Sequence, residues 1–237
     1  MKPILIVLHQ ATSTPGLVGE VLQQKGYELD IRCPAEGDEL PPKMDGHLAA
    51  IVFGGPMSAN DSETLPFIRQ ELHWIPIALQ SEKPFFGICL GAQLLAKVLG
   101  AKVSPHPEGI AEIGYFPITP TEAIAHQFPF PQYVYHWHRE GFELPAGAQL
   151  LATGKTFSNQ AFRYGKNAYA VQFHPEITRK MVKKWTRLAA DMLTLPGAQS
   201  RDRHLHHNRL YAKESELWLR EFLENWLAPT HPNLFGK

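Results

Sequence analysis

The alternation of short apolar runs with helical segments is the feature of this sequence that most limits its fold. Runs of strand length lie at residues 4–9 (ILIVLH), 27–32 (YELDIR), 48–55 (LAAIVFGG) and 84–88 (PFFGI). Apolar residues recur at helical spacing over residues 16–26, 62–80, where Ser62 is the expected N-cap, and 92–100. Strands that alternate with helices in this way predict an α/β fold, with a mostly parallel central sheet and helices on both of its faces.

Two later regions follow different patterns. Residues 102–170 are richer in Pro, Gly and alternating polarity, which predicts mixed or antiparallel strands around residues 113–119, 133–138 and 168–173. A helix is expected over residues 177–194. Farther on, an apolar stripe at helical spacing ends before Pro229 and consists of Leu219, Phe222, Leu223, Trp226 and Leu227. We therefore expect a main domain over residues 1–194, and a C-terminal extension over residues 195–237 whose amphipathic helix packs on it.

Composition argues against several kinds of partner. The 23 basic residues balance the 23 acidic ones, whereas nucleic acids and anionic membranes both require a basic surface. We therefore expect neither as a partner. No apolar run approaches the roughly 18 residues of a membrane span. The two cysteines, Cys33 and Cys89, provide no disulfide framework. Such cysteine usage indicates a reducing compartment, the cytoplasm, and we expect a structural role for Cys33.

Cys89 lies where an apolar strand ends and a helix begins, between Gly87 and Gly91 in the stretch FFGICLGAQLLA (85–96). A cysteine in apolar surroundings is commonly a small buried hydrophobe. Here, however, glycines flank a sharp strand-to-helix turn, as in the G-x-S-x-G elbow of hydrolases. A helix N-terminus also favours the thiolate, and ligands of open α/β sheets bind at the carboxyl ends of strands. These features make a nucleophilic cysteine the alternative to a structural one, and the pattern by itself does not decide between the two.

A nucleophilic cysteine requires a base, and the stretch VQFHPE (171–176) supplies one. His174 follows an apolar strand, and Pro175 favours an extended backbone that turns His174 and Glu176 to the same side. A carboxylate on the far ring nitrogen fixes the tautomer of a histidine base. The competing interpretation is a loop histidine beside a surface glutamate.

The negative charge that develops on the substrate requires backbone N–H donors. The stretch FGGPMS (53–58) ends another inner strand. The N–H groups of Gly55 and Leu90 are therefore the predicted oxyanion hole, although a double glycine before proline is also common in plain strand-ending turns.

Taken together, GGPMS, GICLGAQLLA and VQFHPE, in this order and spacing, resemble the class I glutamine amidotransferases, the family with a Cys-His-Glu triad. Within that family, the stretches GGPMSANDSETLPFI, VYHWHREGFELPAGAQLLA and NQAFRYGKNAYAVQFHPEIT resemble the stand-alone proteins described as GMP-synthase-like glutamine amidotransferases. The resemblance spans residues 1–194. It implies a flavodoxin-like fold, glutamine or a γ-glutamyl compound as substrate, no metal and no organic cofactor.

The resemblance also implies roles for individual residues. Cys89 attacks a γ-carboxamide, the N–H groups of Gly55 and Leu90 hold the oxyanion, and His174, paired with Glu176, moves the protons. The residues expected to bind the substrate are Gly54, Gln93, Trp137, His138, Arg139 and Glu140. The chain departs from the pattern at one point, because relatives commonly have His-Gly-Asp where this sequence has His138-Arg139-Glu140.

Several alternatives stay open at this stage. The same triad serves a glutaminase that passes ammonia to a separate synthetase and a γ-glutamyl peptidase, in which an amine leaves instead. The sequence contains neither G-x-x-x-x-G-K-[ST] nor G-x-G-x-x-G, so the ammonia passes to a separate protein or to none. A non-catalytic binding or regulatory protein on the same fold is a third interpretation. The stretch HLHH (204–207) is either a metal site or, as we expect, a solvated connector.

Overall fold

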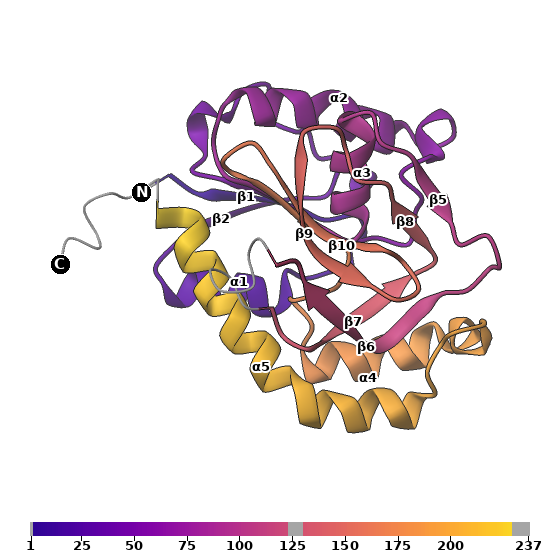
Figure 1. The fold of residues 1–237 in the computed structure, drawn as a ribbon. Helices are drawn as coiled ribbons and strands as arrows, with labels where there is room; N and C mark the ends of the chain where they lie inside the picture. The colour runs from indigo at the N-terminus through magenta and orange to yellow at the C-terminus, as the bar shows by residue number, and fades with distance from the viewer. Residues whose placement is uncertain (1, 123–129, 229–237) are drawn as a thin grey trace.

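The fold is built on one large central sheet. The computed structural model describes residues 2–122 and 130–228 (Figure 1). In order across the sheet, the nine strands are β2 (Leu29–Arg32), β1 (Ile4–Val7), β3 (Ala50–Val52), β4 (Phe85–Ile88), β11 (Ala168–Val171), β10 (Asn159–Tyr164), β9 (Ala148–Gly154), β6 (Glu112–Pro120) and β7 (Tyr133–His138). A small second sheet pairs β5 (Val103–Pro105) with β8 (Glu140–Phe142).

The first half of the sheet is parallel, as the alternating sequence pattern predicted. From β2 through β1, β3 and β4 to β11, each strand pairs in parallel with the next. Every residue of β1, β3 and β4 is buried, because helices cover both faces of these strands. This explains why the three strands read as continuous apolar runs instead of alternating ones.

The second half of the sheet is antiparallel. Strands β6 and β7 pair with each other, and β6 also pairs with β9, which confirms the antiparallel strands predicted around residues 113–119 and 133–138. Strand β11 joins the two halves, because it is parallel to β4 and antiparallel to β10. The last strand in the chain therefore lies in the middle of the sheet, beside the strand that precedes Cys89.

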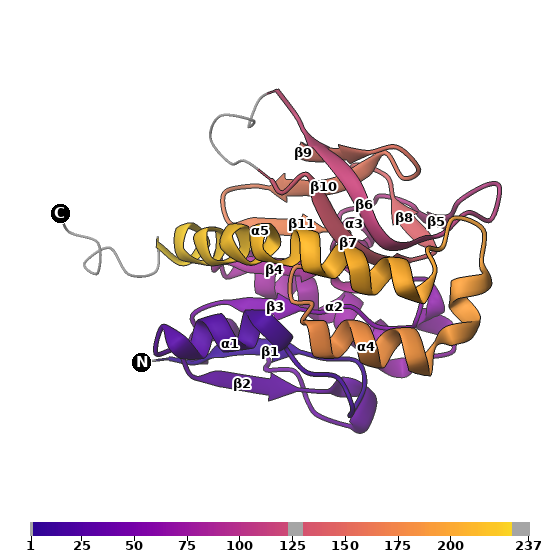
Figure 2. The same ribbon diagram turned by 90° about the horizontal axis from the view of Figure 1, so that it is seen from below.

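Helices cover the two faces of the sheet (Figures 1 and 2). One face is covered by α1 (Gly16–Gln24) and α5 (Arg201–Leu227), whose apolar residues share a core with β1, β3 and β4. The opposite face is covered by α2 (Pro66–Gln80) and α3 (Leu90–Val98), which form a second core. The chain thus has the mixed α/β, flavodoxin-like architecture expected from its sequence. No helix in the described part of the chain is long and apolar enough to cross a bilayer.

Two helix boundaries differ from the sequence prediction. Ser62 is not an N-cap, because it lies in a separate 3-10 turn, Asp61–Glu63, and α2 begins only at Pro66. Proline suits the first position of a helix, where its missing N–H costs nothing. In place of one helix over residues 177–194, the structure has the shorter helix α4 (Arg179–Leu188), followed by a 3-10 segment, Ala190–Thr194.

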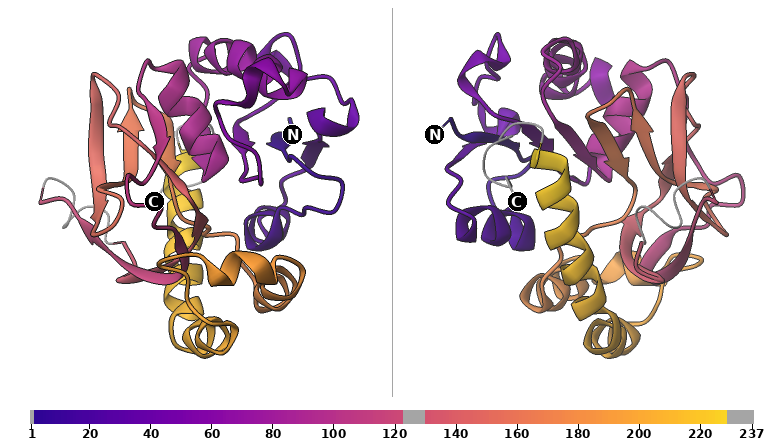
Figure 3. Two further views of the ribbon diagram at one scale, coloured as in Figure 1. Left: turned by 90° about the vertical axis from the view of Figure 1, so that its right-hand side faces the viewer. Right: turned by 60° about the vertical axis from the view of Figure 1, so that its left-hand side comes forward.

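The C-terminal helix α5 runs along the molecule from the region of α4 to the side where the N-terminus lies (Figure 3). Its predicted apolar stripe is buried in the core shared with α1 and the parallel strands and consists of Leu219, Phe222, Leu223, Trp226 and Leu227. Pro229 lies outside the described residues. The interpretation of residues 204–207 as a solvated connector is wrong, because they form part of α5 and His204 is fully buried. The Nδ1 atom of His204 lies 3.0 Å from the Tyr135 hydroxyl.

Candidate active site

Cys89 occupies the sharp turn between β4 and α3. Its φ of +50° and ψ of −104° place it in a region that residues with a Cβ rarely adopt, and such strain concentrates at functional sites. The flanking glycines permit the turn. A Cβ on Gly87 would lie 2.6 Å from the Gly91 carbonyl oxygen, and a Cβ on Gly91 would overlap the Val52 carbonyl oxygen. The G-x-C-x-G pattern is therefore a steric requirement of this elbow.

His174 and Glu176 follow β11, the strand next to β4 in the sheet. The Nδ1 atom of His174 lies 2.7 Å from Oε1 of Glu176, and both side chains are buried. Burial alone would lower the pKa of His174, but the charges of Glu176 and Cys89 outweigh it and raise that pKa to about 10. His174 is therefore an imidazolium at neutral pH. Its Nε2 atom is buried, with no partner at ordinary hydrogen-bond distance within the described residues.

Gly54 lies against both Cys89 and His174. A Cβ placed on Gly54 would be 2.7 Å from Cε1 of His174 and 3.3 Å from Cβ of Cys89. The two side chains thus border the same small space, and only a glycine leaves that space open. The structure therefore brings together Cys89, His174, Glu176 and Gly54, as the sequence predicted.

The two predicted oxyanion donors also lie beside this space. Leu90 is the first residue of α3, so its N–H has no acceptor within the helix, and Gly55 packs on Leu90, since a Cβ on Gly55 would lie 3.1 Å from Cδ2 of Leu90. Within the described residues, neither backbone N–H donates a hydrogen bond. Both donors are available to an anion at the elbow.

His9 and Glu71 hold the Gly54–Gly55 peptide, and sequence reasoning did not identify them. The Nδ1 atom of His9 lies 3.2 Å from the Gly54 carbonyl oxygen, while its Nε2 atom lies 3.0 Å from Oε2 of Glu71. Both side chains are fully buried. In a trans peptide the N–H points opposite to the C=O, so fixing the Gly54 oxygen also fixes the direction of the Gly55 N–H.

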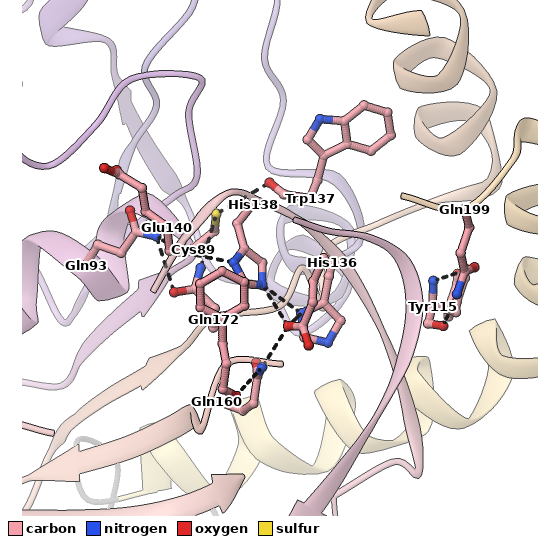
Figure 4. A network of polar contacts seen from close by, with 12 residues as sticks. Cys89, Gln93, Tyr115, His136, Trp137, His138, Glu140, Gln160, Gln172 and Gln199 are labelled. Atoms are coloured by element: carbon pink, nitrogen blue, oxygen red, sulfur yellow. Dashed lines mark hydrogen bonds and ion pairs between the residues drawn. The ribbon is translucent and has the colours of Figure 1, made fainter. Parts of the chain in front are cut away.

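The segment predicted to bind substrate meets the elbow through its backbone (Figure 4). The carbonyl oxygen of Trp137 lies 4.0 Å from Sγ of Cys89, whereas the Trp137 indole packs on Trp185, and its Nε1 donates to Met192. Gln93 donates from Nε2 to the Glu140 carbonyl oxygen at 2.9 Å. The predicted residue Gln93 is therefore connected to the predicted segment 137–140.

The polar contacts of the His138 side chain are with residues of the second half of the sheet and of β8. The side chain is buried, and its Nε2 lies 3.1 Å from Oε2 of Glu112 and 3.2 Å from Nδ1 of His136. Burial lowers the pKa of His136 to about 3, although the Glu112 carboxylate opposes this. Burial alone would raise the pKa of Glu112, but His136, His138 and Gln160 together lower it to about 2. A carboxylate and a neutral imidazole thus stand together in the interior.

Arg139 and Glu140 differ in exposure. Arg139 is exposed and makes no ion pair within the described residues, while Glu140 is half-buried. Both follow His138, whose Nδ1 lies 2.8 Å from the Glu140 carbonyl oxygen. The guanidinium of Arg139, which stands at the glycine position of the common His-Gly-Asp pattern, is therefore accessible to a solute.

Gln172 is a further residue that the sequence analysis missed. It is fully buried, and its Nε2 lies 3.7 Å from Sγ of Cys89 (Figure 4). Its Oε1 accepts from Gln93 at 3.3 Å. Side chains two residues apart in an extended chain point the same way, so the spacing of Gln172 and His174 was the available signal for a second polar group on that side.

A strained cysteine elbow, a buried His–Glu pair and two backbone N–H groups that have no acceptor among the described residues lie at the carboxyl edge of the parallel strands, where open α/β sheets bind their ligands. The family profile described as "Glutamine amidotransferase class-I" matches residues 20–186. The chain belongs to the class-I glutamine amidotransferase family, and the resemblance inferred from its motifs is confirmed.

Similar proteins include both curated sequences and solved structures. The chain is 36% identical to the glutamine amidotransferase-like protein YfeJ of Salmonella typhimurium, over 75% of this chain and 77% of that protein. It is 28% identical to a glutamine-hydrolyzing GMP synthase subunit of Ignicoccus hospitalis, over 68% and 82%. The crystal structure of a Thermotoga maritima glutamine amidotransferase superposes with a TM-score of 0.85 at 30% identity, covering 95% of this chain and 97% of the other.

Proposed function

We propose that the protein hydrolyses the γ-carboxamide of glutamine through a γ-glutamyl thioester on Cys89. The observation that carries this proposal is the shared space at Gly54, bordered by the strained Cys89 and by the His174 ring. We assign catalysis to the domain over residues 1–194, on which the extension packs. With two free cysteines and balanced charge, we expect the protein to work in the cytoplasm.

In the first half-reaction, the Cys89 sulfur forms a bond to the γ-carbon, and the carbonyl electron pair moves to oxygen. The N–H groups of Gly55 and Leu90 stabilise that oxyanion. When the tetrahedral intermediate collapses, the C–N bond breaks, and His174 gives its proton to the departing nitrogen, so ammonia leaves.

In the second half-reaction, water attacks the thioester. His174, now neutral, takes a proton from that water, and the C–S bond breaks as glutamate forms. Glu176 accepts the Nδ1–H of His174 throughout, which holds the ring so that Nε2 faces the reacting atoms.

The direct test is labelling by an electrophilic glutamine analogue, followed by product analysis. One adduct is expected on Cys89, with release of ammonia and glutamate from glutamine by the untreated protein. Cys33 is the internal control, because burial raises the pKa of its thiol and disfavours the thiolate. Cys89→Ser should lose both labelling and turnover, while Cys33→Ser keeps both. An adduct on Cys33 alone, or turnover that survives Cys89→Ser, would exclude the mechanism and favour a non-catalytic role.

The fate of the ammonia is a separate part of the proposal. Relatives include glutamine-hydrolyzing subunits of GMP synthase from Ignicoccus hospitalis and Saccharolobus solfataricus. By analogy, we infer that this protein supplies ammonia to a separate synthetase. Glutaminase activity that rises when such a synthetase and its substrates are added would support the inference, whereas full activity without any partner would count against it.

The exposed Arg139 favours a second candidate, a γ-glutamyl peptidase. Its guanidinium, which pairs with no carboxylate among the described residues, could bind the carboxylate of a departing amino acid or peptide, a group that glutamine lacks on its leaving side. Arg139→Gly is then expected to lower kcat/KM for γ-glutamyl peptides several-fold, the equivalent of about 1 kcal/mol, and to leave glutamine unchanged. Equal effects on both substrates would remove Arg139 from the choice of leaving group.

A further inference from the structure

A cluster of metal-ligating side chains lies behind the elbow and takes no part in the hydrolysis described above. It consists of Glu112 on β6 and of His136 and His138 on β7 (Figure 4). The antiparallel register sets Glu112 directly opposite His138 and Gly114 opposite His136. Two neighbouring strands therefore direct three donor side chains to one point.

The donor atoms have the spacing of a metal site. Oε2 of Glu112 lies 3.1 Å from Nε2 of His138 and 3.5 Å from Nδ1 of His136, and the two ring nitrogens lie 3.2 Å apart. Zinc bonds to nitrogen and oxygen are about 2.0–2.2 Å long, so neighbouring ligands of a tetrahedral zinc lie about 3.3 Å apart. The three donor atoms therefore have the separations that one such ion requires.

The contacts of His138 separate the roles of its two ring nitrogens. Nδ1 lies 2.8 Å from the Glu140 carbonyl oxygen, which can only accept, so Nδ1 is the donor in this contact. Nε2 is the ring nitrogen that faces Glu112 and His136.

The groups around the cluster resemble the outer shell of known zinc sites. Metal-bound histidines commonly donate their other N–H to a backbone carbonyl, and metal-bound carboxylates accept further hydrogen bonds. His138 donates to the Glu140 carbonyl oxygen, and Glu112 accepts from Nε2 of Gln160 at 2.9 Å. His136 makes its polar side-chain contacts through Nδ1 alone, since its Nε2 has no partner within the described residues.

Although the family resemblance implies no metal, we propose that Glu112, His136 and His138 bind one divalent transition-metal ion, with zinc the best match to the donor set. The bound His136 carries its ring proton on Nε2, so that Nδ1 is free to coordinate. Three protein ligands leave a further coordination position for water.

The ion would fix the wall of the active site without touching the reacting atoms. His136 and His138 flank Trp137, whose carbonyl oxygen lies near Sγ of Cys89, and His138 contacts the Glu140 carbonyl that also receives Gln93. His138 and Gln93 thus meet at one carbonyl oxygen, that of Glu140, and Gln93 is connected through Gln172 to Cys89 (Figure 4). Its role would be to position the segment 137–140.

The test measures metal binding by the purified full chain, independently of turnover. After removal of metal with a chelator, the protein is titrated with zinc in competition with a chromophoric chelator. We expect one zinc per chain, with an affinity at least about 100-fold lower in Glu112→Gln and in His136→Gln. The matched control is the double variant His206→Gln/His207→Gln in α5, which removes histidines outside the cluster and should bind as wild type does.

A second measurement requires no variant and so does not depend on the folding of one. X-ray absorption of the zinc-loaded wild type should show nitrogen and oxygen ligands at about 2.0–2.2 Å with scattering from two imidazoles. The proposal is overturned if wild type binds no stoichiometric zinc, if binding survives Glu112→Gln, or if the control variant abolishes it. Each of these outcomes would mean that the cluster is a hydrogen-bonded group without a metal ion.

Discussion

Nδ1 of His174 lies 2.7 Å from Oε1 of Glu176 in the interior of the protein, and this contact keeps a buried imidazole charged. Burial by itself favours the neutral ring. The raised pKa of His174, about 10, therefore reflects the charges of Glu176 and Cys89. Loss of either charge is expected to lower the pKa of His174.

The first prediction concerns this charge and the stability of the fold. Because the pKa of His174 is raised from 6.5 to about 10 on folding, the group stabilises the folded state fully below pH 6.5, and this contribution is lost as the pH rises toward 10. Glu176→Gln lowers the pKa of His174 and should flatten this dependence. Urea unfolding at several pH values measures it, with the exposed Glu221→Gln as the control. A variant curve parallel to that of wild type would contradict the coupling.

The second prediction concerns the space at Gly54. Gly54→Ala places a methyl group 2.7 Å from Cε1 of His174, so the ring must shift. A displacement of about 1 Å in a reacting group can cost about 100-fold in rate, and we expect a loss of this size in kcat. Gly46→Ala is the control, because a Cβ there meets nothing within 4 Å. Wild-type kcat in Gly54→Ala would show that His174 does not need its present position.

The third prediction assigns a positioning role to His9. His9→Gln loses the ring that joins Glu71 to the Gly54 carbonyl, so the Gly55 N–H is no longer held in one direction. We expect kcat to fall at least about 10-fold, short of the roughly 10²–10³-fold loss of a whole oxyanion donor, with little change in KM. His47→Gln, in the separate His47–Asp30 pair, should leave kcat unchanged. A change in KM alone would indicate substrate binding instead.

Features of this protein that depend on neighbouring residues could be predicted from the sequence, and features that depend on contacts between distant segments could not. The elbow at Cys89 and the His174–Glu176 pair are local patterns of glycine, proline and alternation, and they were identified from the sequence. The boundaries of α2 were missed because the turn around Ser62 forms its own short helix. The helical state of residues 204–207 was missed because their histidines and polar neighbours interrupt the apolar pattern, although His204 packs on Tyr135 and Trp137.

The contacts of His9 with Glu71 and of Glu112 with His138 could not be predicted, because each joins distant segments. The second contact depends on the register between β6 and β7. A shift of one residue would turn every side chain to the opposite face, and no local pattern determines that register.

The fourth prediction concerns the C-terminal helix. Phe222 is 2% exposed and packs on Phe86, with ring centroids 4.6 Å apart. Phe222→Ala should lower the free energy of unfolding by about 3–5 kcal/mol, as for other buried aromatic residues. Leu217→Ala on the same helix is the control, because Leu217 is 59% exposed and should change stability by less than about 0.5 kcal/mol. Equal effects would mean that α5 is not part of the core.

The pairing of Ile88 with Val171 has a consequence for how the protein acquires activity during synthesis. Cys89 follows one of these residues and His174 lies just beyond the other, so the proposed nucleophile and its proposed base meet only when β11 inserts between β4 and β10. Contacts between such distant segments form late, because a long loop must close first. A ribosome releases the cysteine turn well before the histidine exists. The site proposed above therefore assembles only when β11, the last strand in the described part of the chain, completes the sheet.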